Sequence, residues 1–206
     1  IYEETLNQSE KLGDKKNTSL SLRKFGVIYY HNSDYEKALD YFIRSLEISE
    51  LINDKALISM ALNNIGVIYK KQNNNDKSLE YYTRAIKIAE EIGDKDKIAY
   101  ISVFIGSYYL LKGNVDTALD YYNRSLKISE ELGKKDDMGE ALNKIGDVFN
   151  ENGDYDIALD YYARSLKIFE EIGDKSGMGA SLNNIGLVHQ NKGDYDKALD
   201  YYGRSL

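Results

Sequence analysis

Apolar residues recur along this chain with the spacing of amphipathic helices. In one stretch, Leu182, Ile185, Gly186 and His189 fall at positions i, i+3, i+4 and i+7, which places them on one helix face. An earlier stretch has the same kind of spacing, at Ala158, Leu159, Tyr162, Ser165, Leu166, Phe169 and Ile172. Between such stretches, Lys-Gly-Asp or Asn-Gly-Asp combines a glycine that ends one helix with an aspartate that caps the next. The pattern predicts pairs of helices of about 18 residues, joined by short turns.

The same sequence is written about five times at a period of 40 residues. The copy that begins at Gly153 recurs with small changes at Gly113 and Gly193, and more loosely at Ser33 and Asn73. A fixed period of roughly 20 to 50 residues is typical of repeat arrays, whose units share one continuous core. We therefore expect one all-α domain over residues 1–206, an α-solenoid of antiparallel helix hairpins.

The repeat also predicts where each unit begins and ends. Residues 1–17 match the back half of a second helix and are expected to belong to a preceding repeat. The last unit stops halfway along its second helix, which indicates a fragment of a longer protein. The remaining units are expected at residues 18–53, 54–93, 94–133, 134–173 and 174–206.

Small residues mark the place where the two helices of a unit are expected to cross. Gly186 and Ala198 remove side-chain bulk there, and Tyr202 fills the gap beside them. First helices with such a glycine are centred on Gly26, Gly66, Gly106, Gly146 and Gly186.

These positions resemble the tetratricopeptide repeat family. Its pattern has an apolar residue and a glycine, an aromatic residue three positions on, an alanine twelve on from the glycine, an aromatic residue four later and a small residue three beyond. Residues that meet this pattern are Ile145, Gly146, Phe149, Ala158, Tyr162 and Ser165. The resemblance covers essentially the whole chain, and it implies a right-handed superhelix whose first helices line a concave groove.

The chain departs from the family pattern in several places. There is no proline near the end of a unit, and Ser78, Ser102 and His189 replace an alanine, a large apolar residue and an aromatic residue. The period of 40, in place of about 34, implies longer helices. It resembles the extended repeats of spindle-orientation adaptors, kinesin light chains, peptide-sensing bacterial regulators and the sensor arms of bacterial signalling proteins.

The resemblance also implies which residues face the groove, namely those at fixed offsets from each first-helix glycine. Counted in this way, the groove is basic early, apolar in the middle and acidic to polar late. The residues expected to contact a protein or peptide are Asn63, Asn64, Val67, Lys70, Lys71, Tyr100, Val103, Phe104, Ser107, Leu111, Asn143, Lys144, Asp147, Asn183 and Asn184.

One groove position carries a recurring asparagine, at Asn63, Asn143 and Asn183. A side-chain amide offers both a donor and an acceptor to the backbone of an extended peptide. Asparagine is also a common surface residue in this Asn-rich chain, so both interpretations remain open.

The first helix of the third unit, Ile98 to Leu111, is apolar on nearly every face. Tyr100, Phe104 and Leu111 would form an apolar patch of the kind that marks a partner site. Burial by neighbouring helices is the alternative. The partner interpretation is favoured because the same positions in the other units are mostly polar.

Composition argues against several other function classes. The chain has 27 Lys and Arg against 34 Asp and Glu, and a net charge of −7 does not favour nucleic acid as a partner. It has no cysteine and no proline, and no apolar stretch reaches the length of a membrane helix. His31 and His189 each stand alone, without metal-ligand or acid-base neighbours. We expect a protein that is not an enzyme, needs no cofactor or metal, and resides in the cytoplasm, although weak glycosylation sequons at Asn7, Asn17 and Asn123 leave export open.

The sequence thus predicts a protein-interaction scaffold that binds a peptide or protein segment in its concave groove. The ligand is expected to complement Lys70 and Lys71 on one side, and Glu140, Asp147 and Glu151 on the other. One alternative is homotypic self-association into dimers or filaments. Another is a regulatory or sensor arm of a larger signalling protein.

Overall fold

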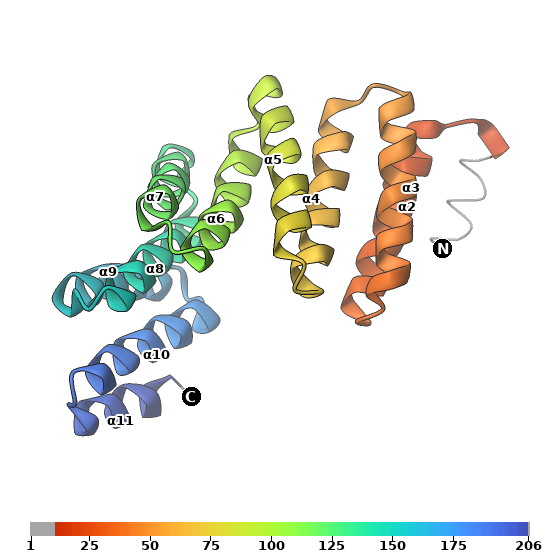
Figure 1. The fold of residues 1–206 in the computed structure, drawn as a ribbon. Coiled ribbons are helices and arrows are strands. Elements are labelled where there is room, and N and C mark those ends of the chain that lie inside the picture. The colour runs from red at the N-terminus through yellow and green to blue at the C-terminus, as the bar shows by residue number, and fades with distance from the viewer. Residues whose placement is uncertain (1–10, 206) are drawn as a thin grey trace. The chain divides into compact units, whose positions relative to one another are not determined.

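Helices make up most of residues 11–205, the part of the chain that the computed structural model describes (Figure 1). No strand occurs in that part. The helices are α2 (Lys15–His31), α3 (Tyr35–Leu51), α4 (Lys55–Lys71), α5 (Asn75–Ile92), α6 (Lys95–Leu111), α7 (Val115–Leu132), α8 (Lys135–Glu151), α9 (Tyr155–Ile172), α10 (Lys175–Asn191) and α11 (Tyr195–Arg204).

The chain divides into two compact units within α6. Unit 1 is Ile1–Ile101 and unit 2 is Ser102–Leu206. In unit 1, α2 packs on α3, α3 on α4, and α4 on α5; in unit 2, each helix from α7 to α10 packs on the next. Paired helices stacked in this way confirm the predicted all-α, α-solenoid fold.

One expected segment, residues 1–17, lies at the start of the chain. Because α2 begins at Lys15, residues 15–17 belong to that helix and not to a preceding second helix. Residues 1–10 of the same expectation lie outside the described residues. The expectation of one continuous array through both units stays a prediction.

The turns within hairpins share a residue of positive φ, and a capping side chain follows it in some of them. The caps predicted at Asp154 and Asp194 are not made, because neither side chain accepts a capping hydrogen bond. Gly113 has a φ of 76°, as the glycine stop predicts, and Ser33 and Asn73 adopt 60° and 58° at the equivalent position. Asp34 and Asn74 then cap the following helices, each accepting a hydrogen bond of 3.2 Å from the main-chain N–H three residues on. The turn geometry is therefore the same in units that lack the glycine.

In each described hairpin, the glycine of the first helix packs against an aromatic ring of the second helix, as predicted. A Cβ atom added to Gly146 would lie 2.6 Å from the Tyr162 ring, and one added to Gly186 would lie 2.7 Å from the Tyr202 ring. Such distances are too short for any side chain, so each glycine is required by the ring packed against it. The pairs are Gly26 with Phe42, Gly66 with Tyr82, Gly106 with Tyr122, Gly146 with Tyr162, and Gly186 with Tyr202.

The departures from the family pattern are accommodated locally. The buried Ser78 hydroxyl donates a hydrogen bond of 2.9 Å to the carbonyl of Gly66, which satisfies its polar atom. His189 stacks on Tyr201 with ring centroids 5.5 Å apart, much as Phe149 stacks on Tyr161 at 5.6 Å. Among the described helices, none is long and apolar enough to cross a membrane.

Candidate partner-binding site

Unit 1 holds a small pocket between its first helices, which we call the amide pocket. Its volume is about 190 Å³, and it is lined by Val27, Tyr30, His31, Phe42, Asn63, Asn64, Val67 and Tyr100. Asn63 Oδ1 and Asn64 Nδ2 are both buried, and neither has a hydrogen-bond partner among the described residues. The pocket therefore presents one acceptor and one donor that the folded chain leaves unsatisfied.

The reason Asn63 is unsatisfied becomes clear beside the equivalent residue of unit 2. Asn143 is buried, its Nδ2 donates to Ser181 Oγ at 3.1 Å, and its Oδ1 lies 3.2 Å from the same hydroxyl. The residue 38 positions after Asn63 is Ile101, which has no hydroxyl to offer. Asn183, the third of the recurring asparagines, is exposed and accepts a hydrogen bond of 2.7 Å from Ser205 Oγ.

Unit 2 holds two larger pockets, bordered by α6, α7, α8, α9 and α10. The first, which we call the leucine pocket, has a volume of about 600 Å³ and is lined by Ser107, Leu110, Leu111, Tyr122, Lys144, Asp147, Asn150, Glu151 and Leu187. The second, which we call the acidic pocket, has a volume of about 470 Å³ and is lined by Asp136, Asp137, Glu140, Asn143, Lys144, Asp147, Phe169, Asp174, Ser176, Gly177, Ala180 and Asn184.

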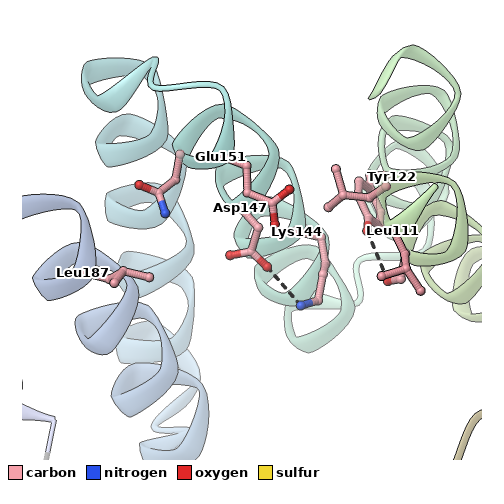
Figure 2. Close-up of a pocket in the computed structure, with 9 residues that line it drawn as sticks. Leu111, Tyr122, Lys144, Asp147, Glu151 and Leu187 are labelled. Carbon is pink, nitrogen blue, oxygen red and sulfur yellow. Dashed lines mark hydrogen bonds and ion pairs between the residues drawn. The ribbon is translucent and has the colours of Figure 1, made fainter. Parts of the chain in front are cut away.

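Lys144 and Asp147 belong to both pockets of unit 2. Figure 2 shows them on α8 beside Glu151, with Leu111 on one side and Leu187 on the other. Lys144 Nζ lies 3.0 Å from Asp147 Oδ2, and this ion pair forms part of the lining of both pockets.

Asp147 is held by two further donors, which fix the position of its carboxylate. Tyr162 OH donates to Asp147 Oδ1 at 2.9 Å, and Asn184 Nδ2 donates to the same atom at 3.3 Å. Burial alone would lower the pKa of Lys144, but the charge and hydrogen bond of Asp147 outweigh it, and the pKa is raised. Burial, followed by the charge of Asp147, raises the pKa of Tyr162. Both shifts favour the protonated form, in which Lys144 is charged and Tyr162 is neutral.

Most of the predicted groove residues line one of these pockets. Asn63, Asn64, Val67 and Tyr100 line the amide pocket, whereas Ser107, Leu111, Asn143, Lys144, Asp147 and Asn184 line the pockets of unit 2. The three pockets do not include Lys70, Lys71, Val103, Phe104 or Asn183.

Two of the expected contact residues have little exposed surface. Val103 is only 7% exposed and packs in the hydrophobic core with Tyr122 and Ile145, so it has almost no surface for a partner. Asn143 is equally buried, because it is committed to Ser181 of the next hairpin. In both cases the helix face predicted to be open is partly covered by a neighbouring helix.

The apolar patch predicted on α6 is distributed over two pockets. Tyr100 is 44% exposed and lines the amide pocket, and Leu111 is 65% exposed and lines the leucine pocket. Phe104, between them in sequence, is half-buried. Ile98, Ala99, Ile101 and Ile105 are buried, so most of the apolar character of this helix serves the core.

Sequence reasoning missed Phe169 and Gly177, which line the acidic pocket, and Gly139, which packs on the same ring. A Cβ added to Gly139 would lie 2.6 Å from the Phe169 ring, and one added to Gly177 would overlap that ring. The equivalents of Phe169 are Ser49, Ala89 and Ser129. Aligning the repeats would have revealed this substitution of one large residue for a small one, with glycines on both sides.

Acidic side chains gather in unit 2 without forming a metal site. Within residues 11–205, no three His, Cys, Asp or Glu side chains are grouped so that they could hold a metal ion. The chemistry available in the pockets is hydrogen bonding, ion pairing and apolar contact.

Comparison with known protein families gives a match over most of the chain. A family model described as Tetratricopeptide repeat matches residues 57–132 and 137–206. The comparison with curated protein sequences gives no match.

Solved structures of similar fold include the following three proteins. BtubC (BKLC) from P. vanneervenii is 20% identical with a TM-score of 0.85, and the alignment covers 99% of this chain and 86% of that one. A Rap protein complexed with Competence and Sporulation Factor is 19% identical with a TM-score of 0.81, covering 97% of this chain and 56% of that one. NprR in complex with its cognate peptide NprX is 18% identical with a TM-score of 0.72, covering 98% and 60%. At these identities the likeness establishes the fold.

Proposed function

Because this chain belongs to the tetratricopeptide repeat family, we propose that it is an interaction scaffold that binds an extended peptide or protein segment against its first helices. The role is non-catalytic and needs no cofactor. In this proposal the amide pocket and the two pockets of unit 2 are the sites of contact.

The observation that carries the proposal is the pair of buried, unpartnered amide atoms in the amide pocket. A buried polar atom without a partner costs about 1–3 kcal/mol. The main chain of an extended peptide offers an N–H to Asn63 Oδ1 and a carbonyl to Asn64 Nδ2. Binding would therefore recover a cost that the free protein carries.

The surroundings of the two amides suit a peptide as well. Tyr30 and Tyr100 supply aromatic walls against which an apolar side chain loses contact with water. The Rap and NprR structures, similar in fold, were solved with a factor and with a cognate peptide, which supports this kind of ligand. Lys70 and Lys71, exposed at the end of α4, add positive charge that would complement an acidic residue of the segment.

The test is selection of random linear peptides, displayed on phage, against the immobilised chain. Enriched peptides are then measured by fluorescence polarisation with the wild type and with the double variant Asn63→Ala, Asn64→Ala. We expect a loss of affinity of about tenfold or more, because two hydrogen bonds of ~1 kcal/mol each are removed.

Asn123→Ala is the matched control, because Asn123 is exposed on α7 and lines none of the three pockets. The absence of any enriched peptide would contradict the scaffold role. Enriched peptides that bind the double variant as tightly as the wild type would move the site away from the amide pocket. A sensor arm of a larger protein would use the same binding step and is covered by the same test.

A further inference from the structure

We infer that the acidic pocket of unit 2 binds the side chain of a lysine or arginine in the partner segment, next to an apolar side chain in the leucine pocket. The inference rests on the proposed function, because it specifies the chemistry of the segment that the first helices bind. It concerns pockets that share no residue with the amide pocket.

The charge of the acidic pocket selects a cation. Its lining has the carboxylates of Asp136, Asp137, Glu140, Asp147 and Asp174, against the single ammonium of Lys144. Lys144 is paired with Asp147 at 3.0 Å, and Asp136, Glu140 and Asp174 add further negative charge to the lining. A concave surface lined by one sign of charge concentrates the opposite charge within it.

The shape and lining of the pocket favour an organic cation over a metal ion. A volume of about 470 Å³ is far larger than a metal ion requires, and no cluster suited to a metal occurs among the described residues. Phe169 also lines the pocket, but it is only 5% exposed, so the carboxylates carry the preference for a cation.

The position of Phe169 depends on a local change in the repeat. Gly139 on α8 and Gly177 on α10 leave room for the Phe169 ring, which comes from α9. At the sites equivalent to Gly177, the other repeats have the larger residues Asn17, Leu57, Lys97 and Asp137. The packing of Phe169 beside this pocket is therefore a feature of this one joint between repeats.

The leucine pocket supplies the apolar neighbour of the basic side chain. Leu111 and Leu187 are 65% and 40% exposed, on opposite sides of the charged residues of α8 (Figure 2). Because Lys144 and Asp147 line both pockets, an extended segment that passes the ion pair places one side chain in each. The selected sequence is thus a basic residue close to an apolar one.

The same phage selection tests the inference, with the double variant Asp136→Asn, Glu140→Gln beside the wild type. Both residues are exposed, so the variant is expected to fold, which circular dichroism would verify. Asp116→Asn, Glu130→Gln is the matched control: it removes the same charge from exposed positions of α7, and Asp116 lies in the first helical turn as Asp136 does.

We expect wild type and control to enrich peptides with Lys or Arg near an apolar residue, and the pocket variant to lose that preference. For one enriched peptide, replacing its basic residue by glutamine is expected to cost the wild type about fivefold or more in affinity and the pocket variant almost nothing. This double-mutant cycle attributes the loss to the pocket itself.

The possible failures are distinguishable. If no peptide is enriched, the proposed function and this inference are both overturned. If peptides are enriched without a basic residue, the scaffold role stands and the inference is wrong. If the basic residue is preferred equally by wild type and pocket variant, the cation binds elsewhere and the acidic pocket is not its site.

Discussion

Unit 1 and unit 2 repeat one hairpin but build different pockets from it. The amide pocket of unit 1 has aromatic walls and no carboxylate, whereas the acidic pocket of unit 2 has five. At the shared repeat position, Asn63 Oδ1 has no partner among the described residues, whereas the side-chain amide of Asn143 is hydrogen-bonded to Ser181. The comparison teaches that the role of a repeat position depends on the residue it meets in the next repeat as much as on its own identity.

The largest expected effect is a loss of stability at the contact of the Phe169 ring with Gly177 in unit 2. Gly177→Ala is expected to destabilise the protein by about 2–3 kcal/mol, because the added Cβ overlaps the Phe169 ring and the core must shift. Urea denaturation followed by circular dichroism measures the free energy of unfolding. Gly203→Ala is the control, because no atom lies within 4 Å of a Cβ there.

A second variant shows whether the clash is with Phe169. Gly177→Ala combined with Phe169→Ala removes the ring, so the alanine at 177 should cost much less in that background. An equal cost in both backgrounds would show that the glycine is required for another reason.

A smaller effect on stability is expected at Asn63 and Asn143, which occupy the same repeat position in unit 1 and unit 2. Asn143→Ala should cost about 1–2 kcal/mol, since it removes a buried hydrogen bond and leaves Ser181 with fewer partners. Asn63→Ala should leave the free energy of unfolding unchanged or slightly raised, because it removes a buried acceptor that has no partner among the described residues. Thermal unfolding of both variants makes the comparison, and equal losses would remove the distinction between the two positions.

The smallest effect is expected from titration of a buried phenol in unit 2. Burial and Asp147 raise the pKa of Tyr162 above its unfolded value of about 10. The stability that this neutral phenol contributes is therefore complete below pH ~10, and it is lost as the pH rises above that value, because the unfolded chain ionises first. Tyr162→Phe should flatten the decline in thermal stability above pH ~10, and an unchanged decline would contradict this assignment. In unit 1 the equivalent residues are Phe42, which cannot titrate, and Tyr82, whose pKa is also raised by burial.

Local patterns account for what the sequence could predict. The hairpins, their glycine stops and the contact of Gly146 with Tyr162 follow from spacing within one unit, and these were found where the pattern places them. The side-chain caps predicted at Asp154 and Asp194 were not found. The groove position of Asn143 was predicted with the same rule, but the rule does not include Ser181, 38 residues on. Burial at a solenoid surface depends on how successive hairpins approach each other, and one repeat does not contain that information.

The candidate site was predicted in outline for a similar reason. Ten of the expected contact residues line the pockets, because the helix face is fixed by periodicity. The acidic pocket also uses Asp136, Asp174 and Phe169, which lie at the start of helices or on a second helix, away from the predicted face. Pockets form between elements, so residues outside the expected face contribute to them.

Phe169 also has a consequence for how such a chain can change in length. A hairpin closed by its own glycine and ring, such as Gly66 with Tyr82, carries its fit within itself and is in principle interchangeable with any other. The Phe169 ring instead requires glycines both in its own hairpin and in the following one, at Gly139 and Gly177. Duplication or exchange of whole 40-residue repeats would preserve the packing within each hairpin but would place the Phe169 ring against a repeat without the matching glycine. The fourth and fifth repeats therefore depend on each other and would have to be inherited as a pair.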